Sequence, residues 1–278
     1  MIKEFDLSYK PHLHVDSVIG WSWLVFKGYD FEKNDMNISS AALNALREQY
    51  EKIAQVKLAD SWGIDFHKSI GSVPAVSSMI MINNAQDALL LSKKVSSKTE
   101  LHQLAGDANT LSPIDYTLET TRPAGAPLSA LVAIKTIGIE GLRRNLANLV
   151  ESAFLLRGLL SGKKGVAILN DKSPGFVTMV QIIPSNVTQK HVLEYDSAEL
   201  KEINSYIARF FKWDKETRVD KVGGAEYSIS SCYYKNTAGV NIAAVKFYPT
   251  SPHMSSAIIK NLVSTFLKQK KIFDELYK

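Results

Sequence analysis

Apolar and polar positions in the first eighty residues follow the order strand, helix, strand, strand. A short run over residues 12–16 predicts a buried strand that ends in a carboxylate. Leu43, Leu46, Tyr50 and Ile53 are three or four positions apart, which predicts a helix of about fourteen residues beginning at Ser39 or Ser40. Apolar runs over 56–64 and 76–82 predict two more strands. This order favours an α/β domain with a mostly parallel sheet.

The middle of the chain contains a long segment without regular periodicity. Residues 91–117 predict a loop, and loops of this length inside a compact domain are usually functional or mobile. A turn-rich stretch then leads into a helix from about Leu128, which Gly138 and Gly141 are expected to interrupt. A second helix is expected over about 142–160 and to end at Ser161-Gly162.

From about residue 162 the pattern changes to short strands and separate helices. Strands are predicted over 165–169, 176–183, 225–234 and 240–248. One helix is expected to be capped by Ser197, and a last helix follows Pro252. We therefore expect residues 1–161 to belong to a large α/β domain and residues 162–278 to form a small α+β domain.

Composition narrows the function classes. The 278 residues are 45% hydrophobic and 22% charged, as in an ordinary globular protein. A single cysteine, Cys232, excludes internal disulfides and multi-cysteine metal sites, and no metal site is predicted. The net charge of +5 is mild, and the lysine clusters at 93–94, 163–164 and 268–271 are interpreted as solvated faces, so nucleic-acid binding is not expected. A signal peptide and a stretch of membrane-spanning length are not recognised, which predicts a cytoplasmic protein without a membrane partner.

Three polar features follow predicted strands or precede a helix: Asp16, the pair His67-Lys68, and Arg122. A lysine held between apolar strands is placed where burial can lower its pKa, and an unprotonated lysine can form Schiff bases. Adjacent parallel strands would bring Asp16 and Lys68 to the same sheet edge. The alternatives are a surface lysine, a turn residue at Asp16, a packed histidine at His67 and a structural ion pair at Arg122.

The order of these motifs resembles a known family. The chain is similar to the group II pyridoxal-phosphate-dependent decarboxylases, the fold type I relatives of aromatic amino acid and glutamate decarboxylases. The resemblance is carried by His14-Val15-Asp16, Ala59-Asp60-Ser61 and Asp65-Phe66-His67-Lys68. The segment Thr117–Arg122 and the small α+β part are also similar to this family. The implied fold is a partial fold type I, aminotransferase-like large domain followed by a small C-terminal domain.

The resemblance implies pyridoxal 5'-phosphate (PLP) as cofactor and assigns residues to it. Lys68 would form the Schiff base, and Asp16 would pair with the pyridine nitrogen. Asp65 would lie near the phosphate, and His14 and Val18 would lie at the cofactor. Ser17 and Val18 depart from the family pattern of two small residues after the aspartate, and Phe66 replaces a usual proline.

The resemblance also implies residues for substrate and catalysis. His67 would lie near the substrate carboxylate or assist proton transfer. Arg122 would hold the mobile loop or a carboxylate, and Tyr116 lies in the region where the family keeps a proton-donating tyrosine. The implied reaction is decarboxylation of an amino acid, a carboxy-lyase activity that leaves an amine. Which amino acid is the substrate does not follow from the sequence.

Family members carry a long N-terminal half ahead of the His-Val-Asp strand, which this sequence lacks. We therefore expect the chain to form a homodimer or to pair with a separately encoded N-terminal half. Two alternatives remain open. One is another PLP-dependent chemistry, such as carbon–carbon lysis or deamination, and the other is an inactive remnant that acts as a subunit or scaffold.

Overall fold

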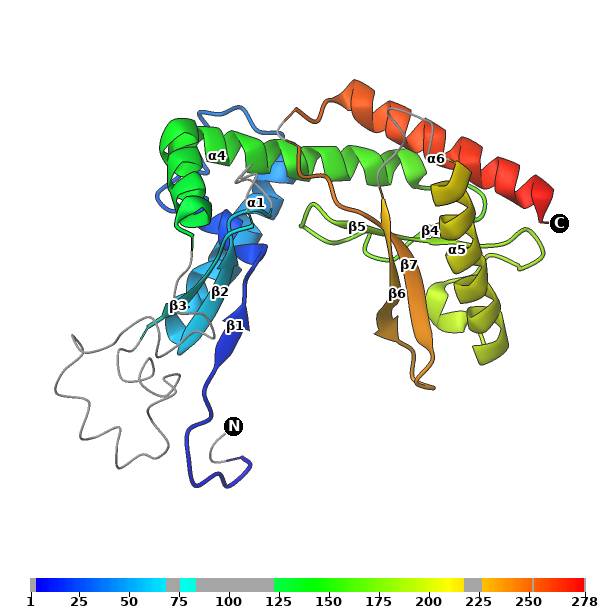
Figure 1. The fold of residues 1–278 in the computed structure, drawn as a ribbon, viewed down its shortest axis with the longest axis horizontal. Helices are drawn as coiled ribbons and strands as arrows, with labels where there is room; N and C mark the ends of the chain where they lie inside the picture. The colour runs from blue at the N-terminus through cyan, green and yellow to red at the C-terminus, as the bar shows by residue number, and fades with distance from the viewer. Residues whose placement is uncertain (1–3, 69–75, 84–122, 218–226, 252, 278) are drawn as a thin grey trace. The chain divides into compact units, whose positions relative to one another are not determined.

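The computed structural model describes residues 4–68, 76–83, 123–217, 227–251 and 253–277 (Figure 1). The chain divides into two compact units. Unit 1 comprises Met1–Phe31 and Arg47–Leu146, and unit 2 comprises Glu32–Leu46 and Ala147–Lys278. The boundary falls at residue 146 rather than at the expected 161, because the helix that ends at Leu160 contributes Leu156 and Leu160 to the core of unit 2.

Unit 1 contains a three-stranded sheet in the order β1-β2-β3, formed by β1 (His14–Asp16), β2 (Ser61–Asp65) and β3 (Ser78–Ile82). β1 and β2 are parallel as expected, whereas β3 is antiparallel to β2, so the described sheet is mixed rather than mostly parallel. The prediction of a buried first strand is wrong, since His14 and Asp16 are exposed. Only one edge of β1 is paired, and the described residues do not cover its outer edge.

The helices in the N-terminal part of the chain differ in part from their predicted extents. The helix α1 (Ser40–Ile53) begins and ends as predicted, although it buries Ala42, Ala45 and Leu46 rather than all four periodic residues. The predicted strand 56–64 is split: its first part is the 3-10 helix η2 (Ala54–Leu58), and only its end is β2. A further 3-10 helix, η1 (Gly20–Phe26), follows β1.

Arg143 fixes the end of η1 to the long helix α4 (Gly125–Leu160). Its side chain is buried, and it donates hydrogen bonds to the backbone oxygens of Val25 at 2.7 Å and Lys27 at 2.8 Å. Glu140 pairs with the same guanidinium at 2.5 Å. A buried guanidinium needs such acceptors because an unpaired one would be costly, and these bonds therefore hold the segment after β1 in place.

The expected interruption of α4 occurs at Gly138, whose φ of 68° and ψ of 171° are non-helical and are reached almost only by glycine. Gly141 lies within the helix. By length and composition α4 could span a membrane, with a window of mean hydropathy 1.3 that is 11% buried, so the expectation that no such stretch exists is wrong. Any window of eighteen residues in α4 with at most two charged side chains includes Gly138, so the apolar stretch is not a straight helix.

Unit 2 is a four-stranded antiparallel sheet packed with helices (Figure 1). The strands β4 (Val166–Ile168), β5 (Thr178–Ile182), β6 (Ser228–Lys235) and β7 (Asn241–Phe247) are arranged in the order β4-β5-β7-β6. Every residue of β5 is buried, so both faces of the sheet are covered there. The helices α5 (Ser197–Thr217) and α6 (Ser256–Leu276) supply Phe210, Phe266 and Phe273 to the core. The expected α+β arrangement of this region is observed.

Two helix ends show how local sequence sets these elements. Gly162 has a φ of 71° and follows the last turn of α4, as expected of a C-terminal glycine. The predicted cap of α5 at Ser197 is wrong by one residue. The Asp196 carboxylate accepts from the backbone nitrogens of Ala198 and Glu199, each at 2.8 Å, and Glu199 accepts from the Asp196 nitrogen at 3.0 Å. This reciprocal pair is a capping box in which aspartate is the cap.

Candidate active site

The register of the sheet in unit 1 places the predicted site residues on one face. Asp16 pairs with Gly63 across β1 and β2, and Asp65 pairs with Ser78 across β2 and β3. Because side chains alternate along a strand and partners share a face, Asp16, Gly63 and Asp65 point to the same side. Gly63 has no side chain, which leaves room between the two carboxylates.

These residues line a cavity of 310 Å³. Its walls are formed by residues of all three strands and the turn after β1, namely His14, Asp16, Val18, Gly63, Ile64, Asp65, Ser78, Met79 and Ile80. A Cβ placed on Gly63 would lie 3.6 Å from Val18 Cγ1 and 3.9 Å from His14 Nε2. The glycine therefore adjoins the two residues predicted to lie at the cofactor, and a larger side chain there would occupy the cavity.

Asp65 is the best-connected polar residue of this cavity. Its carboxylate lies 2.5 Å from Lys68 Nζ and accepts from Ser78 Oγ at 2.6 Å, while Trp21 Nε1 donates to its backbone oxygen at 2.9 Å. Burial alone would raise the pKa of the carboxyl. The hydrogen bonds from Lys68 and Ser78, together with the charge of Lys68, outweigh burial and hold the pKa of Asp65 below its ordinary value. Asp65 is therefore a carboxylate at neutral pH.

Lys68 folds back onto the end of its own strand. Its backbone nitrogen donates to the Asp65 oxygen at 3.3 Å, and this turn brings the ammonium to the Asp65 side chain. The expected burial is not observed, because 34% of the Lys68 side chain is exposed. An ammonium held by a carboxylate is not a nucleophile, so covalent chemistry requires the amine to leave Asp65 and lose a proton.

His67 packs against the strand that follows. Its Nδ1 lies 3.2 Å from both the nitrogen and the oxygen of Ser77, and its Nε2 lies 3.9 Å from the Asp65 carboxylate. This arrangement corresponds to the alternative of a packed, hydrogen-bonded histidine. A ring held at Nδ1 in this way directs its Nε2 toward the Asp65 carboxylate.

Asp16 and His14 make local contacts within β1 and the turn after it. The Asp16 carboxylate accepts from the Val18 nitrogen at 3.2 Å, which is the turn interaction considered as an alternative to a cofactor role. His14 Nδ1 lies 2.7 Å from Ser61 Oγ, and His12 Nε2 lies 2.8 Å from the same oxygen. Because Asp16 also lines the cavity, its turn contact leaves the second carboxylate oxygen available to a ligand.

Serines of the strands were not among the predicted site residues. Ser78 orients the Asp65 carboxylate, and Ser61 holds two histidines. Ser17 Oγ donates to the Gly63 oxygen at 2.6 Å and so ties the turn after β1 to β2. The contacts of these serines depend on strand register. The alternation of polar and apolar residues in the sequence does not show the register unless the pairing partners are known.

Two predicted residues and one predicted loop lie outside the described residues. Tyr116, Arg122 and the 91–117 loop belong to the range 84–122, whose placement the structure does not describe. Their expected roles stay predictions.

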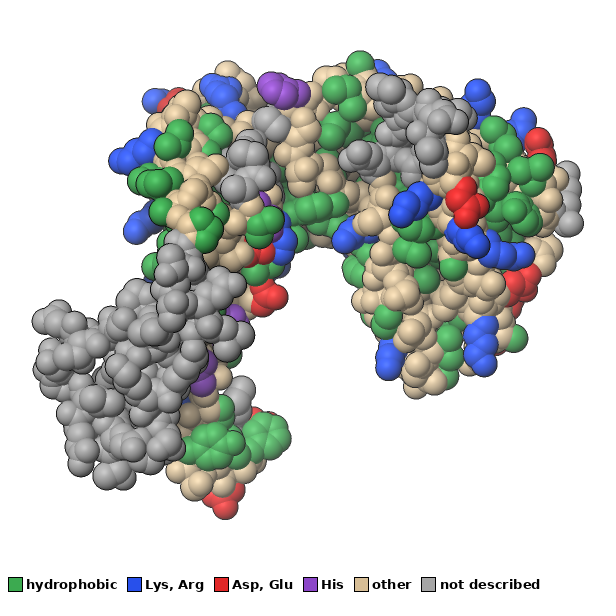
Figure 2. Space-filling view, in the orientation of Figure 1, with side chains coloured by type: hydrophobic (Ala, Val, Ile, Leu, Met, Phe, Trp, Pro, Cys, Tyr) green, Lys and Arg blue, Asp and Glu red, His purple; other side chains and the backbone are tan. Residues whose placement is uncertain are grey.

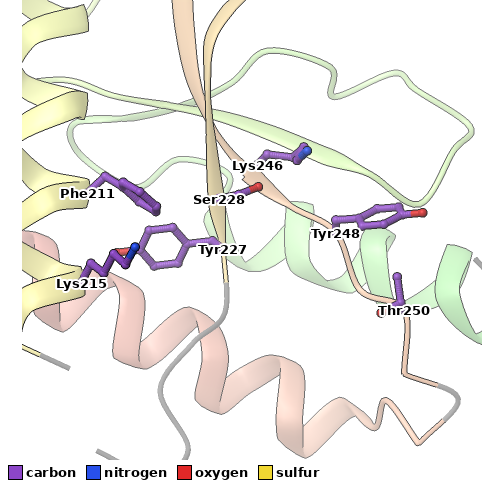
Figure 3. A pocket seen from close by; sticks show the side chains of 7 residues that line it. All are labelled: Phe211, Lys215, Tyr227, Ser228, Lys246, Tyr248 and Thr250. Carbon is purple, nitrogen blue, oxygen red and sulfur yellow. The ribbon is translucent and has the colours of Figure 1, made fainter. Parts of the chain in front are cut away.

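Unit 2 has a separate hollow of 480 Å³ that contains none of the predicted site residues. Figure 3 shows Phe211 and Lys215 reaching it from α5, and Ser228 and Lys246 from β6 and β7.

PLP requires a carboxylate at its pyridine nitrogen and an amine at its aldehyde, and residues at the cavity of unit 1 provide both groups. Asp16 supplies a carboxylate of the kind that pairs with a pyridine nitrogen, Lys68 supplies an amine beside Asp65, and Gly63 leaves space next to the two carboxylates. The described residues that line the cavity do not include a glycine-rich cradle for a phosphate. The donor set thus suits the ring and the aldehyde of the cofactor, while phosphate binding requires other residues.

Comparison with known proteins shows the fold. No family model matches the sequence, and no curated protein matches it at the sequence level. Tryptophan decarboxylase from Catharanthus roseus matches 99% of this chain at 12% identity and a TM-score of 0.58, over 44% of its own length. The 4-hydroxyphenylacetaldehyde synthase from Rhodiola rosea matches 97% of this chain at 14% identity and a TM-score of 0.56, over 44% of its length.

A third solved structure, that of Oryza sativa TDC with PLP and tryptamine, matches 86% of this chain at 13% identity and a TM-score of 0.55. The match covers 43% of that chain. This chain therefore spans less than half the length of the solved structures it matches. Its fold is similar to part of these solved structures, which agrees with the fold type I class that its motifs predict.

Proposed function

We propose that this chain is part of a PLP-dependent amino acid decarboxylase in which Lys68 binds the cofactor. The observation that carries the proposal is the shared face of β1 and β2, on which Asp16, Gly63 and Asp65 line one cavity and Asp65 holds Lys68. The fold of the solved decarboxylases supports the general kind of reaction. When bound, PLP would supply an electron sink for breaking a bond at the substrate α-carbon.

Asp65, Asp16 and His67 would each have a different role in this reaction. Asp65 would orient the Lys68 side chain, whose nitrogen lies 2.5 Å from its carboxylate. Asp16 would hold a proton on the ring nitrogen, because a carboxylate stabilises the positive charge there. His67, fixed by Ser77, would present its Nε2 to the substrate carboxylate or move a proton nearby.

Substitution of Lys68 tests the proposal directly. Lys68→Arg retains a cation beside Asp65 but cannot bind an aldehyde as a Schiff base. We expect the full chain to develop the visible absorption of lysine-bound PLP after the cofactor is added, and Lys68→Arg to lose this absorption completely. Lys57→Arg, a change of the same kind at an exposed lysine in η2, is the matched control and should retain the band.

A band of equal strength in Lys68→Arg and in the unsubstituted chain would contradict the assignment of Lys68. Absence of any band in the unsubstituted chain, repeated with its proposed partner present, would support the alternative of an inactive subunit. Product analysis separates the remaining alternative, since decarboxylation leaves an amine, whereas deamination leaves a keto acid, or an aldehyde when the carboxylate is lost as well. The match to an aldehyde synthase makes this measurement necessary.

We further propose that the cavity of unit 1 is completed by a partner, either a second copy or a separately encoded N-terminal half. Among the described residues, the outer edges of β1 and β3 have no neighbouring strand. Exposed large apolar side chains are concentrated in unit 1, on β3 and on the first half of α4, and include Met79, Ile80, Met81, Leu128, Leu131 and Val132. Figure 2 shows hydrophobic side chains at the surface over this part of α4.

Unpaired strand edges and apolar patches favour association. We expect mass photometry to show a dimer of the chain, or a complex when a candidate N-terminal half is co-expressed. Binding of a hydrophobic dye should fall when the complex forms. A well-folded monomer that binds neither dye nor partner would contradict this proposal, without bearing on the role of Lys68.

A further inference from the structure

Unit 2 contains a second cavity, of 750 Å³, between the loop 183–189 and helix α6. Its volume lies in the range of small-molecule sites. Its lining includes apolar side chains from both sides, Pro184 and Val187 of the loop and Leu267 of α6, together with charged side chains of α6 and of the turn before β4. All residues that line it belong to the described part of the chain.

The cavity has an excess of positive charge. It is lined by three lysines, Lys164, Lys270 and Lys271, and by one carboxylate, Asp274. Lys164 and Lys271 are exposed at the rim, and ion-pair partners for them do not occur among the described residues. The local net charge of the lining is therefore positive, and an anion would be attracted into the cavity.

Lys270 is the unusual member of this set. The sequence pattern placed it in a solvated lysine cluster, but it is only 5% exposed. Its ammonium donates to Asp274 at 2.8 Å and lies 5.6 Å from the centre of the Tyr206 ring. The second oxygen of Asp274 accepts from the Tyr206 hydroxyl at 2.5 Å, so both carboxylate oxygens are occupied.

A lysine ammonium has three donors, and within the described residues the hydrogen-bond acceptor of Lys270 is Asp274. The ammonium lies so close to Gly165 that a Cβ there would be 2.9 Å from Nζ. Gly165 itself has a φ of 69° and lines the cavity. Because Gly165 has no side chain, the Lys270 ammonium reaches the cavity. Among the described residues, two of its three N–H donors have no acceptor. Burying such donors without acceptors is costly.

We propose that this cavity binds a small organic anion whose phosphate or carboxylate accepts hydrogen bonds from Lys270, Lys164 and Lys271. The apolar side chains of Pro184, Val187 and Leu267 would contact the organic part of the ligand. The site is separate from the cavity of unit 1 and does not depend on the proposed function. Ser185 and Thr188 of the loop 183–189 also line the cavity and add hydroxyl donors of the kind that bind phosphate oxygens.

The test is a nuclear magnetic resonance titration of the full chain, without PLP, at constant ionic strength. Inorganic phosphate and acetate are added separately, so that the two arms distinguish phosphate from carboxylate. We expect saturable shifts of backbone amides in residues 164–165 and 183–189 with at least one of the two anions. Shifts without saturation, or shifts confined to residues 14–18 and 61–65, would overturn the proposal.

Two double variants provide a matched comparison. Lys164→Gln with Lys271→Gln removes two rim lysines and should weaken binding by about ten-fold or more. Lys163→Gln with Lys268→Gln removes the same charge from neighbouring exposed lysines outside the cavity and should bind as the unsubstituted chain does. Equal weakening in both would mean that only general electrostatics act, which contradicts a specific site. Thermal unfolding of both variants verifies that they are folded.

Discussion

At the scale of single residues, the candidate site depends on one carboxylate. Asp65 receives the Lys68 ammonium from its own turn, the Ser78 hydroxyl from β3 and, through its backbone, the Trp21 indole from η1. Each of these groups comes from a different element. Asp65 therefore couples the position of the proposed cofactor lysine to the packing of the strands around it.

The lowered pKa of Asp65 gives a pH dependence with a definite sign. The folded state binds fewer protons than the unfolded state, so the carboxylate stabilises the fold above its ordinary pKa of about 3.9, and this stabilisation is lost as pH falls through the lower folded pKa. We expect Asp65→Asn to reduce the free energy of unfolding at pH 7 by about 2 kcal/mol, since it removes a charged hydrogen bond.

Urea unfolding at pH 7 and at about pH 3 measures the effect. The difference between the variant and the unsubstituted chain should shrink at the lower pH, because about pH 3 lies below the ordinary pKa, where the unfolded chain binds a proton and the stabilising effect of the carboxylate declines. Asp35→Asn is the control, as Asp35 is exposed and, within the part of the chain that the structure describes, forms its ion pair with the exposed Lys33. An equal difference at both pH values would contradict the carboxylate's role.

At the scale of elements, the turns and caps decide where strands and helices begin and end. The turn after β2 returns Lys68 to the strand it leaves, and Gly138 divides α4 into two parts. The capping box at Asp196 begins α5 one residue before the position that the sequence pattern suggested. Backbone nitrogens at a helix start need acceptors, and the residue that supplies them is set by geometry.

The cap of α5 gives a prediction that compares adjacent residues. We expect Asp196→Ala to lower the melting temperature by about 2–4 °C, because it removes the acceptor of two backbone nitrogens. Ser197→Ala should leave the melting temperature unchanged, since the described contacts of the helix start use Asp196. Differential scanning calorimetry of both variants measures this. A larger loss in Ser197→Ala would mean that the serine is the cap.

At the scale of the whole molecule, buried apolar side chains are distributed unequally between the two units. The large hydrophobic cluster of the described residues lies in unit 2, where β5 is buried on both faces and aromatic side chains of α5 and α6 pack together. In unit 1 the side chains of β3 are largely exposed. Local stability follows the density of buried apolar contacts, so the two units should differ in it.

Hydrogen exchange measured by mass spectrometry tests this difference. We expect amides of β5 and β7 to be the most protected and amides of β3 to exchange much faster. If a partner completes the cavity of unit 1, the complex should slow exchange in β1 and β3 while leaving β5 unchanged. Equal protection of β3 and β5 in the isolated chain would contradict an incomplete unit 1.

The sequence alone determined much of this protein, because local patterns fix local structure. The order of elements, the extent of α1, the break at Gly138 and the terminal Gly162 follow from apolar spacing and from backbone conformations that glycine favours. The motifs from His14 to Lys68 also predicted the fold class that the solved structures share.

The tertiary structure decided everything that depends on partners distant in the chain. The mixed sheet, the shared face of Asp16 and Asp65, and the hold of Ser78 on that carboxylate all require strand register. The same holds for Lys270, which the sequence places in an exposed lysine cluster and the fold buries beside Tyr206 and Asp274. Register and burial arise from contacts between segments far apart in sequence, and periodicity within one segment carries no information about them.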